Sequence, residues 1–117
     1  MAKKIESYSQ LIDVCRSAGL WYVGSYIGEF LRNDKWRSPD TKEEFIKYMY
    51  KEYGAGDRDI SGTRTRVNCL IRIVESGYVI DALNLVLEAN DSKLGCYQSK
   101  INARSTLDLI ETGKLKI

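Results

Sequence analysis

Apolar residues recur at spacings of three and four along most of the chain, which is the period of an amphipathic α-helix. The first stripe consists of Ile5, Tyr8, Leu11, Ile12, Cys15 and Ala18. Gly19 follows this stripe, where a glycine commonly ends a helix. Residues 20–31 begin with strand-like composition, yet their apolar positions also form one helical face, and we favour a helix over a strand.

Two glycines stand four residues apart in this second segment, at Gly24 and Gly28. On a helix they would share one face and leave a smooth groove, because glycine has no side chain. The pattern predicts that another helix approaches closely there. Alternatively, the same face serves as a self-association contact between two copies of the chain.

The clearest helix start signal lies at residues 38–43, after a polar connection that contains Trp36. Either Ser38 is the N-cap and Pro39 the first helical residue, or Asp40 is the cap and Glu43 completes a capping box. The stripe that follows runs to Tyr53, and we expect Gly54 to end the helix.

The second half of the chain predicts three further helices. Residues 54–62 are expected to form a loop, with Thr63 capping a helix that stops at Gly77. Residues 79–89 are apolar on most sides, which is typical of a central helix. A last helix is expected at about residues 97–111. The alternating residues 114–117 predict a short extended tail that either packs on the domain or pairs with a partner. We therefore predict an all-α protein, with residues 1–117 forming a single compact domain of about six short helices.

The composition narrows the chemistry that this domain can perform. The chain has 117 residues, 44% of them hydrophobic, and a net charge of +2, which is enough for one core and neither strongly basic nor acidic. It contains no histidine, so the commonest general base and metal ligand is missing. We expect no metal and no cofactor.

The cysteines, Cys15, Cys69 and Cys96, form no CxxC pair and are predicted to be reduced thiols. We find neither a signal-peptide nor a membrane-spanning pattern, which predicts a cytoplasmic protein.

Two arginines near the start of the predicted 63–76 helix are the strongest candidate for a binding site. If Thr63 caps this helix, Arg64 and Arg66 occupy its first turn, where unpaired backbone N–H groups attract anions such as phosphate. We predict nucleic-acid contact through Thr63, Arg64, Thr65, Arg66, Asn68, Arg72, Lys100 and Arg104. The last two join the site only if the final helix lies beside this one. Alternatively, Asp57 and Asp59 pair with the two arginines and leave them without a ligand.

Aromatic residues concentrate in the first half of the chain and suggest a second function. They are Trp21, Tyr22, Tyr26, Trp36, Tyr48, Tyr50 and Tyr53. Most fit the core by their periodicity, whereas Trp36 and Tyr50 lie off the predicted stripes. Because tryptophan and tyrosine are favoured at interface hot spots, these two are the predicted protein-interaction residues. The alternative function is therefore a helical module for protein–protein interaction or self-association.

Paired carboxylates are the remaining option for catalysis. Glu43 with Glu44, and Asp57 with Asp59, are the candidates. Neither pair has a third acid at a ligand-like spacing, and acids are common at helix starts and loops. We therefore expect a binding protein rather than an enzyme.

Overall fold

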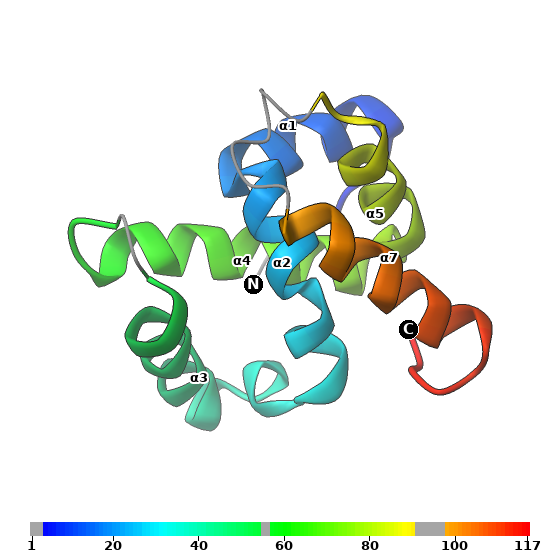
Figure 1. Ribbon diagram of the computed structural model, residues 1–117. Coiled ribbons are helices and arrows are strands. Elements are labelled where there is room, and N and C mark those ends of the chain that lie inside the picture. Colours follow the sequence, from blue (N-terminus) through cyan, green and yellow to red (C-terminus); the bar gives the residue numbers. More distant parts are fainter. Residues whose placement is uncertain (1–3, 55–56, 91–97) are drawn as a thin grey trace.

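Six α-helices and one short 3-10 turn make up the parts of the chain that the computed structural model describes, residues 4–54, 57–90 and 98–117 (Figure 1). In chain order the elements are α1 (Tyr8–Ala18), α2 (Leu20–Arg32), η1 (Lys35–Arg37), α3 (Pro39–Tyr53), α4 (Ile60–Glu75), α5 (Val79–Glu88) and α7 (Gln98–Glu111). These parts contain no β-strand, so the predicted all-α class is confirmed. The radius of gyration of 13.2 Å fits one compact body.

Helix boundaries follow the capping signals at most positions. The Ser7 hydroxyl accepts a hydrogen bond from the Gln10 N–H and caps α1. Gly19 and Gly77 have φ angles of 91° and 79°, in the left-handed region that glycine adopts without steric cost. Both glycines therefore end a helical run, as predicted. Ser38 precedes α3 with Pro39 as its first residue, and Gly54 ends it, which decides between the two predicted starts.

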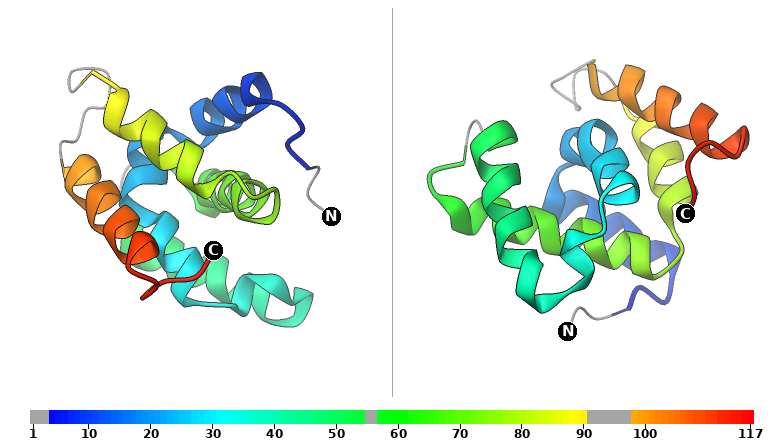
Figure 2. Two further views of the ribbon diagram at one scale, coloured as in Figure 1. Left: turned by 90° about the vertical axis from the view of Figure 1, so that its right-hand side faces the viewer. Right: turned by 90° about the horizontal axis from the view of Figure 1, so that it is seen from below.

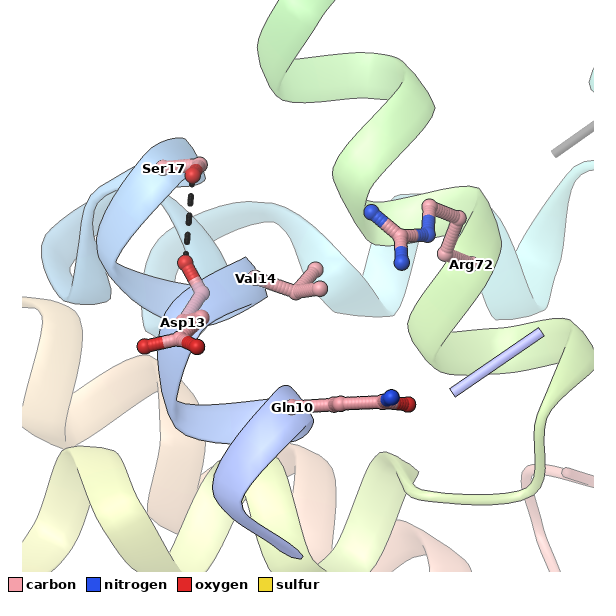
Figure 3. A pocket seen from close by; sticks show the side chains of 5 residues that line it. All are labelled: Gln10, Asp13, Val14, Ser17 and Arg72. Carbon is pink, nitrogen blue, oxygen red and sulfur yellow. Dashed lines mark hydrogen bonds between the residues drawn. The ribbon is translucent and has the colours of Figure 1, made fainter. Parts of the chain in front are cut away.

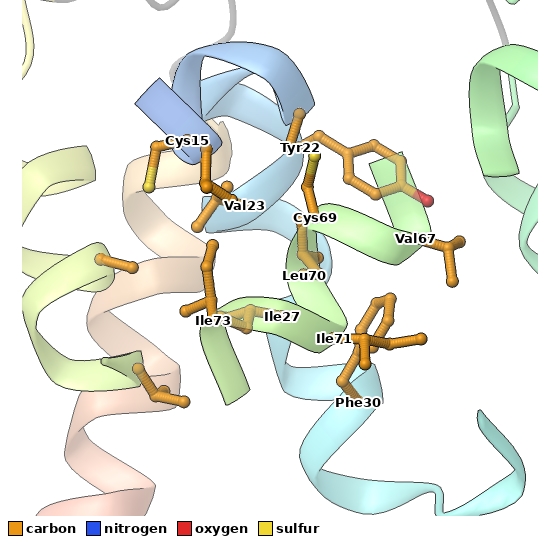
Figure 4. Packing of buried hydrophobic residues seen from close by; sticks show 14 of the residues in the cluster. Cys15, Tyr22, Val23, Ile27, Phe30, Val67, Cys69, Leu70, Ile71 and Ile73 are labelled. Carbon is orange, nitrogen blue, oxygen red and sulfur yellow. The ribbon is translucent and has the colours of Figure 1, made fainter. Parts of the chain in front are cut away.

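The second segment is a helix, and it lies in the middle of the fold. α2 packs against α1, α4, α5 and α7, and seen from below it stands between α3 on one side and α5 with α7 on the other (Figure 2). Its strongly apolar face explains this position, because Tyr22, Val23 and Ile27 are completely buried. Figure 4 shows these side chains among the residues of α4, including Val67, Leu70 and Ile73.

The predicted close helix approach at Gly24 is confirmed. A methyl group on Gly24 would lie 2.7 Å from Val86 Cγ1 of α5 and 2.8 Å from the Ser99 carbonyl oxygen of α7. Gly28 is likewise buried and lies near Thr106 of α7. At Gly24 the chain's own helices fill the groove, whereas Gly28 borders an open cleft, and self-association stays a prediction.

Other segments differ from the predictions. α5 is not buried all round: Ile80 is 41% exposed, and α2 takes the central place instead, because its apolar face is covered on several sides. Residues 114–117 form no strand in the described structure. Cys15 and Cys69 are free and buried, while Cys96 lies outside the described residues. No helix within the described ranges is long and apolar enough to cross a membrane.

Candidate functional site

The helix that carries the two candidate arginines begins earlier than predicted. α4 starts at Ile60, and its N-cap is Asp59, whose Oδ1 accepts a 2.9 Å hydrogen bond from the Ser61 N–H. Hydrogen bonds from Ser61 also hold the pKa of Asp59 below its usual value. The prediction that Thr63 caps the helix is wrong, because an aspartate four residues upstream already satisfies the first turn. Arg64 therefore lies beyond the first turn.

Thr63 has a different role inside the molecule. Its side chain is completely buried, and its hydroxyl donates a 2.7 Å hydrogen bond to Asp57 Oδ2. The other carboxylate oxygen of Asp57 accepts from Arg66 Nε at 3.3 Å. Asp57 thus joins Thr63 to Arg66, so the Thr63 hydroxyl is used inside the molecule and the Arg66 guanidinium, 25% exposed, already has a carboxylate partner.

Arg66 is held by four groups from three segments of the chain. Besides Asp57, its guanidinium donates to the carbonyl oxygen of Ala18, at the end of α1. It also lies 5.1 Å from the centroid of the Trp21 ring and 5.7 Å from that of Tyr22. Carbonyl, carboxylate and aromatic faces together satisfy a partly buried guanidinium, which makes Arg66 a structural residue.

Arg64 is paired with an acid from another helix. Its two terminal nitrogens donate to the two carboxylate oxygens of Glu43 on α3, at 2.5 and 2.6 Å. This pair holds the pKa of Glu43 below its usual value. The predicted pairing with a preceding aspartate is therefore found for Arg66, whose partner is Asp57. Arg64 pairs instead with Glu43, on a different helix.

The other predicted nucleic-acid residues do not gather around the start of α4. The Thr65 hydroxyl donates to the Ser61 carbonyl oxygen at 3.1 Å, and Asn68 is half-buried. Arg72 lines a groove of about 210 Å³ between α4 and α1, where it extends toward Val14 and Gln10 (Figure 3).

Lys100 and Arg104 belong to α7, and this helix packs mainly on α2 and α5. The last helix therefore does not lie beside α4, which was the condition for Lys100 and Arg104 to join the predicted site. The predicted residues are distributed over two separate parts of the molecule.

Trp36 is an internal residue rather than a binding residue. Its side chain is only 3% exposed, and the indole N–H donates a 2.9 Å hydrogen bond to the Phe30 carbonyl oxygen. The prediction of an exposed interaction residue is wrong here, because a short 3-10 turn folds the ring back under α2. Tyr50 is half-buried, as Tyr26 and Tyr53 are, and its role in an interaction stays a prediction.

Three other tyrosines form a continuous aromatic patch, which we name the tyrosine surface: Tyr26, Tyr48 and Tyr53. The rings of Tyr26 and Tyr53 are stacked with their centroids 4.5 Å apart, and those of Tyr48 and Tyr53 lie 6.1 Å apart, edge to face. Tyr48 is 41% exposed. Hydrogen bonding with Tyr48 and partial burial raise the pKa of Tyr53 to about 12. Helical periodicity predicts most of the aromatic residues at the core or its boundary, and Tyr26 and Tyr53 do pack against the core, but periodicity cannot show that two helices bring their tyrosines to a shared edge.

A polar cleft of about 260 Å³ borders the tyrosine surface on one side, and we name it the α2–α7 cleft. It is lined by Ser25, Tyr26, Gly28, Glu29, Arg32, Tyr53, Asn102, Ser105 and Thr106. On the other side, Tyr48 borders a groove of about 280 Å³ with Asn33, Lys35, Glu44 and Phe45. The tyrosine surface therefore lies between two hollows.

Metal chemistry gains no support from the described residues, because no group of three or more potential ligands comes together among them. Comparison with protein-family models, curated proteins and solved structures finds no match for this chain.

Proposed function

We propose that this chain is a non-enzymatic helical binding protein that recognises a protein partner through the tyrosine surface. The observation that carries the proposal is the contiguity of Tyr26, Tyr48 and Tyr53 between two hollows. Tyrosine combines a large apolar ring with a polar hydroxyl, which suits it to surfaces that alternate between solvent and a partner.

The mutual ring contacts also favour binding energetically. Stacking restrains Tyr26 and Tyr53 before any partner arrives, so less side-chain freedom is lost on association. Tyr48, as the most exposed of the three, would provide the first contact. The two hollows beside it would accept protruding side chains of the partner.

Nucleic-acid binding through α4 stays a prediction, and the structure supports it less. Arg64 and Arg66 both have carboxylate partners, so a phosphate would have to displace Glu43 or Asp57. The remaining basic residues are interspersed with acids in a chain of net charge +2, whereas phosphate contacts favour a concentrated basic patch.

The proposal is tested by quantitative affinity capture from an extract of the source cells. The wild-type chain is compared with Tyr48→Ala and with Ile101→Ala, a control residue on α7 that is 46% exposed. We expect a partner whose recovery falls at least tenfold with Tyr48→Ala and is unchanged with Ile101→Ala. Light scattering of the purified chain over a range of concentrations detects a second copy as the partner.

A parallel nucleic-acid shift assay uses the wild type and Arg64→Ala at low and high salt. Salt-sensitive binding that is lost in Arg64→Ala but kept in Tyr48→Ala would replace the proposed function with the predicted nucleic-acid function. Equal recovery of every captured protein by Tyr48→Ala and Ile101→Ala would also overturn it.

A further inference from the structure

The α2–α7 cleft contains two opposite charges that do not neutralise each other. Ser25, Glu29 and Arg32 lie on one face of α2, at spacings of four and three, and all three line the cleft. Spacings of this kind usually allow an acid and a base on a helix to pair. Within the described residues, however, neither Glu29 nor Arg32 has an ion-pair partner.

The two charges lie toward opposite walls. The Arg32 guanidinium folds back over Gly28 toward α7: a β-carbon on Gly28 would lie 3.0 Å from Arg32 Nη1 and 3.2 Å from Thr106 Oγ1. Glu29 follows Tyr26 by one helical turn on α2, and the Tyr26 ring stacks on Tyr53 of α3, which lines the same cleft as Glu29. The cleft therefore has a positive side at α7 and a negative side at α3.

Uncharged groups complete both sides. Near Arg32, α7 contributes the side chains of Asn102 and Ser105, which can donate hydrogen bonds to an anion. The Thr106 hydroxyl already donates to the Asn102 carbonyl oxygen. Near Glu29, the stacked rings of Tyr26 and Tyr53 provide an aromatic wall, and such faces attract cations.

We propose that the α2–α7 cleft binds a small zwitterion, with free α-amino acids as the ligand class. The ligand carboxylate would bind at Arg32 beside α7, and the ligand ammonium at Glu29 beside the two tyrosine rings. A simple anion would be repelled by Glu29 and a simple cation by Arg32, whereas a zwitterion matches both charges. The cleft volume of about 260 Å³ lies just below the range of drug-sized sites, which suits a ligand of this size.

The test uses the purified full chain and free amino acids as probes. The twenty L-α-amino acids are first screened by thermal shift, and the strongest is then titrated by calorimetry. We expect at least one to bind with a dissociation constant below about 1 mM. Its N-acetyl derivative lacks the ammonium and its C-terminal amide lacks the carboxylate, and each should bind at least tenfold more weakly.

Matched variants locate the site. Arg32→Gln and Glu29→Gln should each weaken binding at least tenfold. Arg16→Gln and Glu88→Gln are the controls, because Arg16 is exposed in the last turn of α1, as Arg32 is in that of α2, and Glu88 is an exposed acid at the end of α5. Thermal melts without ligand confirm that all four variants fold.

Three results would overturn the inference: no amino acid binds, the capped derivatives bind as well as the free amino acid, or Arg32→Gln and Glu29→Gln behave like the controls. The inference stands apart from the proposed protein interaction. Tyr48 lies outside the cleft lining, so Tyr48→Ala removes neither charged group of the site and should weaken amino-acid binding much less than Arg32→Gln or Glu29→Gln does.

Discussion

The Arg66 guanidinium lies over the indole ring of Trp21, 5.1 Å from its centroid. The contact places a cation from α4 against the first turn of α2. Because the same guanidinium also bonds to Asp57 and to the Ala18 carbonyl oxygen, it joins α4 and the segment before it to the junction of α1 and α2, 48 residues earlier in the chain. The arginines that looked equivalent in sequence therefore have different roles.

Replacing Arg66 should destabilise the fold much more than replacing Arg64. Arg66→Ala removes two hydrogen bonds and the cation–π contacts, and we expect a loss of about 2–3 kcal/mol in the free energy of unfolding. Arg64→Ala breaks a surface pair whose side chains are 41% and 46% exposed, so its effect should be small. Urea denaturation measures both variants, and an equal shift would contradict the structural role given to Arg66.

Trp36 should be needed for folding and not specifically for binding. Trp36→Ala is expected to cost about 3–5 kcal/mol because it empties a buried site. Trp36→Phe keeps most of the apolar volume but leaves the Phe30 carbonyl oxygen without its donor, and should cost about 1–3 kcal/mol. Chemical denaturation gives both values. A fully stable Trp36→Ala variant would show that the ring is not part of the core.

The two glycines of α2 should respond differently to alanine. Gly24→Ala forces a methyl group against Val86 and the Ser99 carbonyl oxygen, and we expect a loss of about 1–3 kcal/mol. At Gly28 the nearest atoms are the end of the Arg32 side chain and the Thr106 hydroxyl, which can shift. Gly28→Ala should therefore be nearly neutral, helped by the higher helix propensity of alanine. Thermal unfolding of both variants distinguishes the two outcomes.

The buried Cys15 thiol should make the fold sensitive to alkaline pH. Burial raises the pKa of Cys15 from 9.0 to about 12, so the folded chain retains a proton that the unfolded chain releases. The stabilisation is complete below pH 9 and declines as the pH rises from 9 toward 12. Urea midpoints at pH 8 and pH 10.5 should differ less in Cys15→Ala than in the wild type. An identical difference in both proteins would exclude this contribution.

Much of the fold could be predicted because each helix is indicated by residues within or next to its own segment. The periodic stripes give the helices, and Gly19, Gly54 and Gly77 mark where three of them end. The start of α4 was misplaced because Gly62 suggests a loop, whereas in the structure it lies within the helix, beside the Asp57 carboxylate.

The candidate site was less predictable because its contacts are not local. Glu43 lies 21 residues before Arg64, and no local pattern indicates that they meet. Trp36 occupies a three-residue turn that is too short to show a period. The charges at Glu29 and Arg32 look like an ordinary helical pair, and only the placement of α3 and α7 separates them.

The Arg66 junction also has a dynamic consequence. The Arg66 guanidinium is hydrogen-bonded both to the last residue of α1 and to Asp57, just before α4. The end of α1 and the beginning of α4 should therefore unfold together rather than fray independently. Their backbone amide protons would then exchange with deuterated solvent at a common rate, as one cooperative unit.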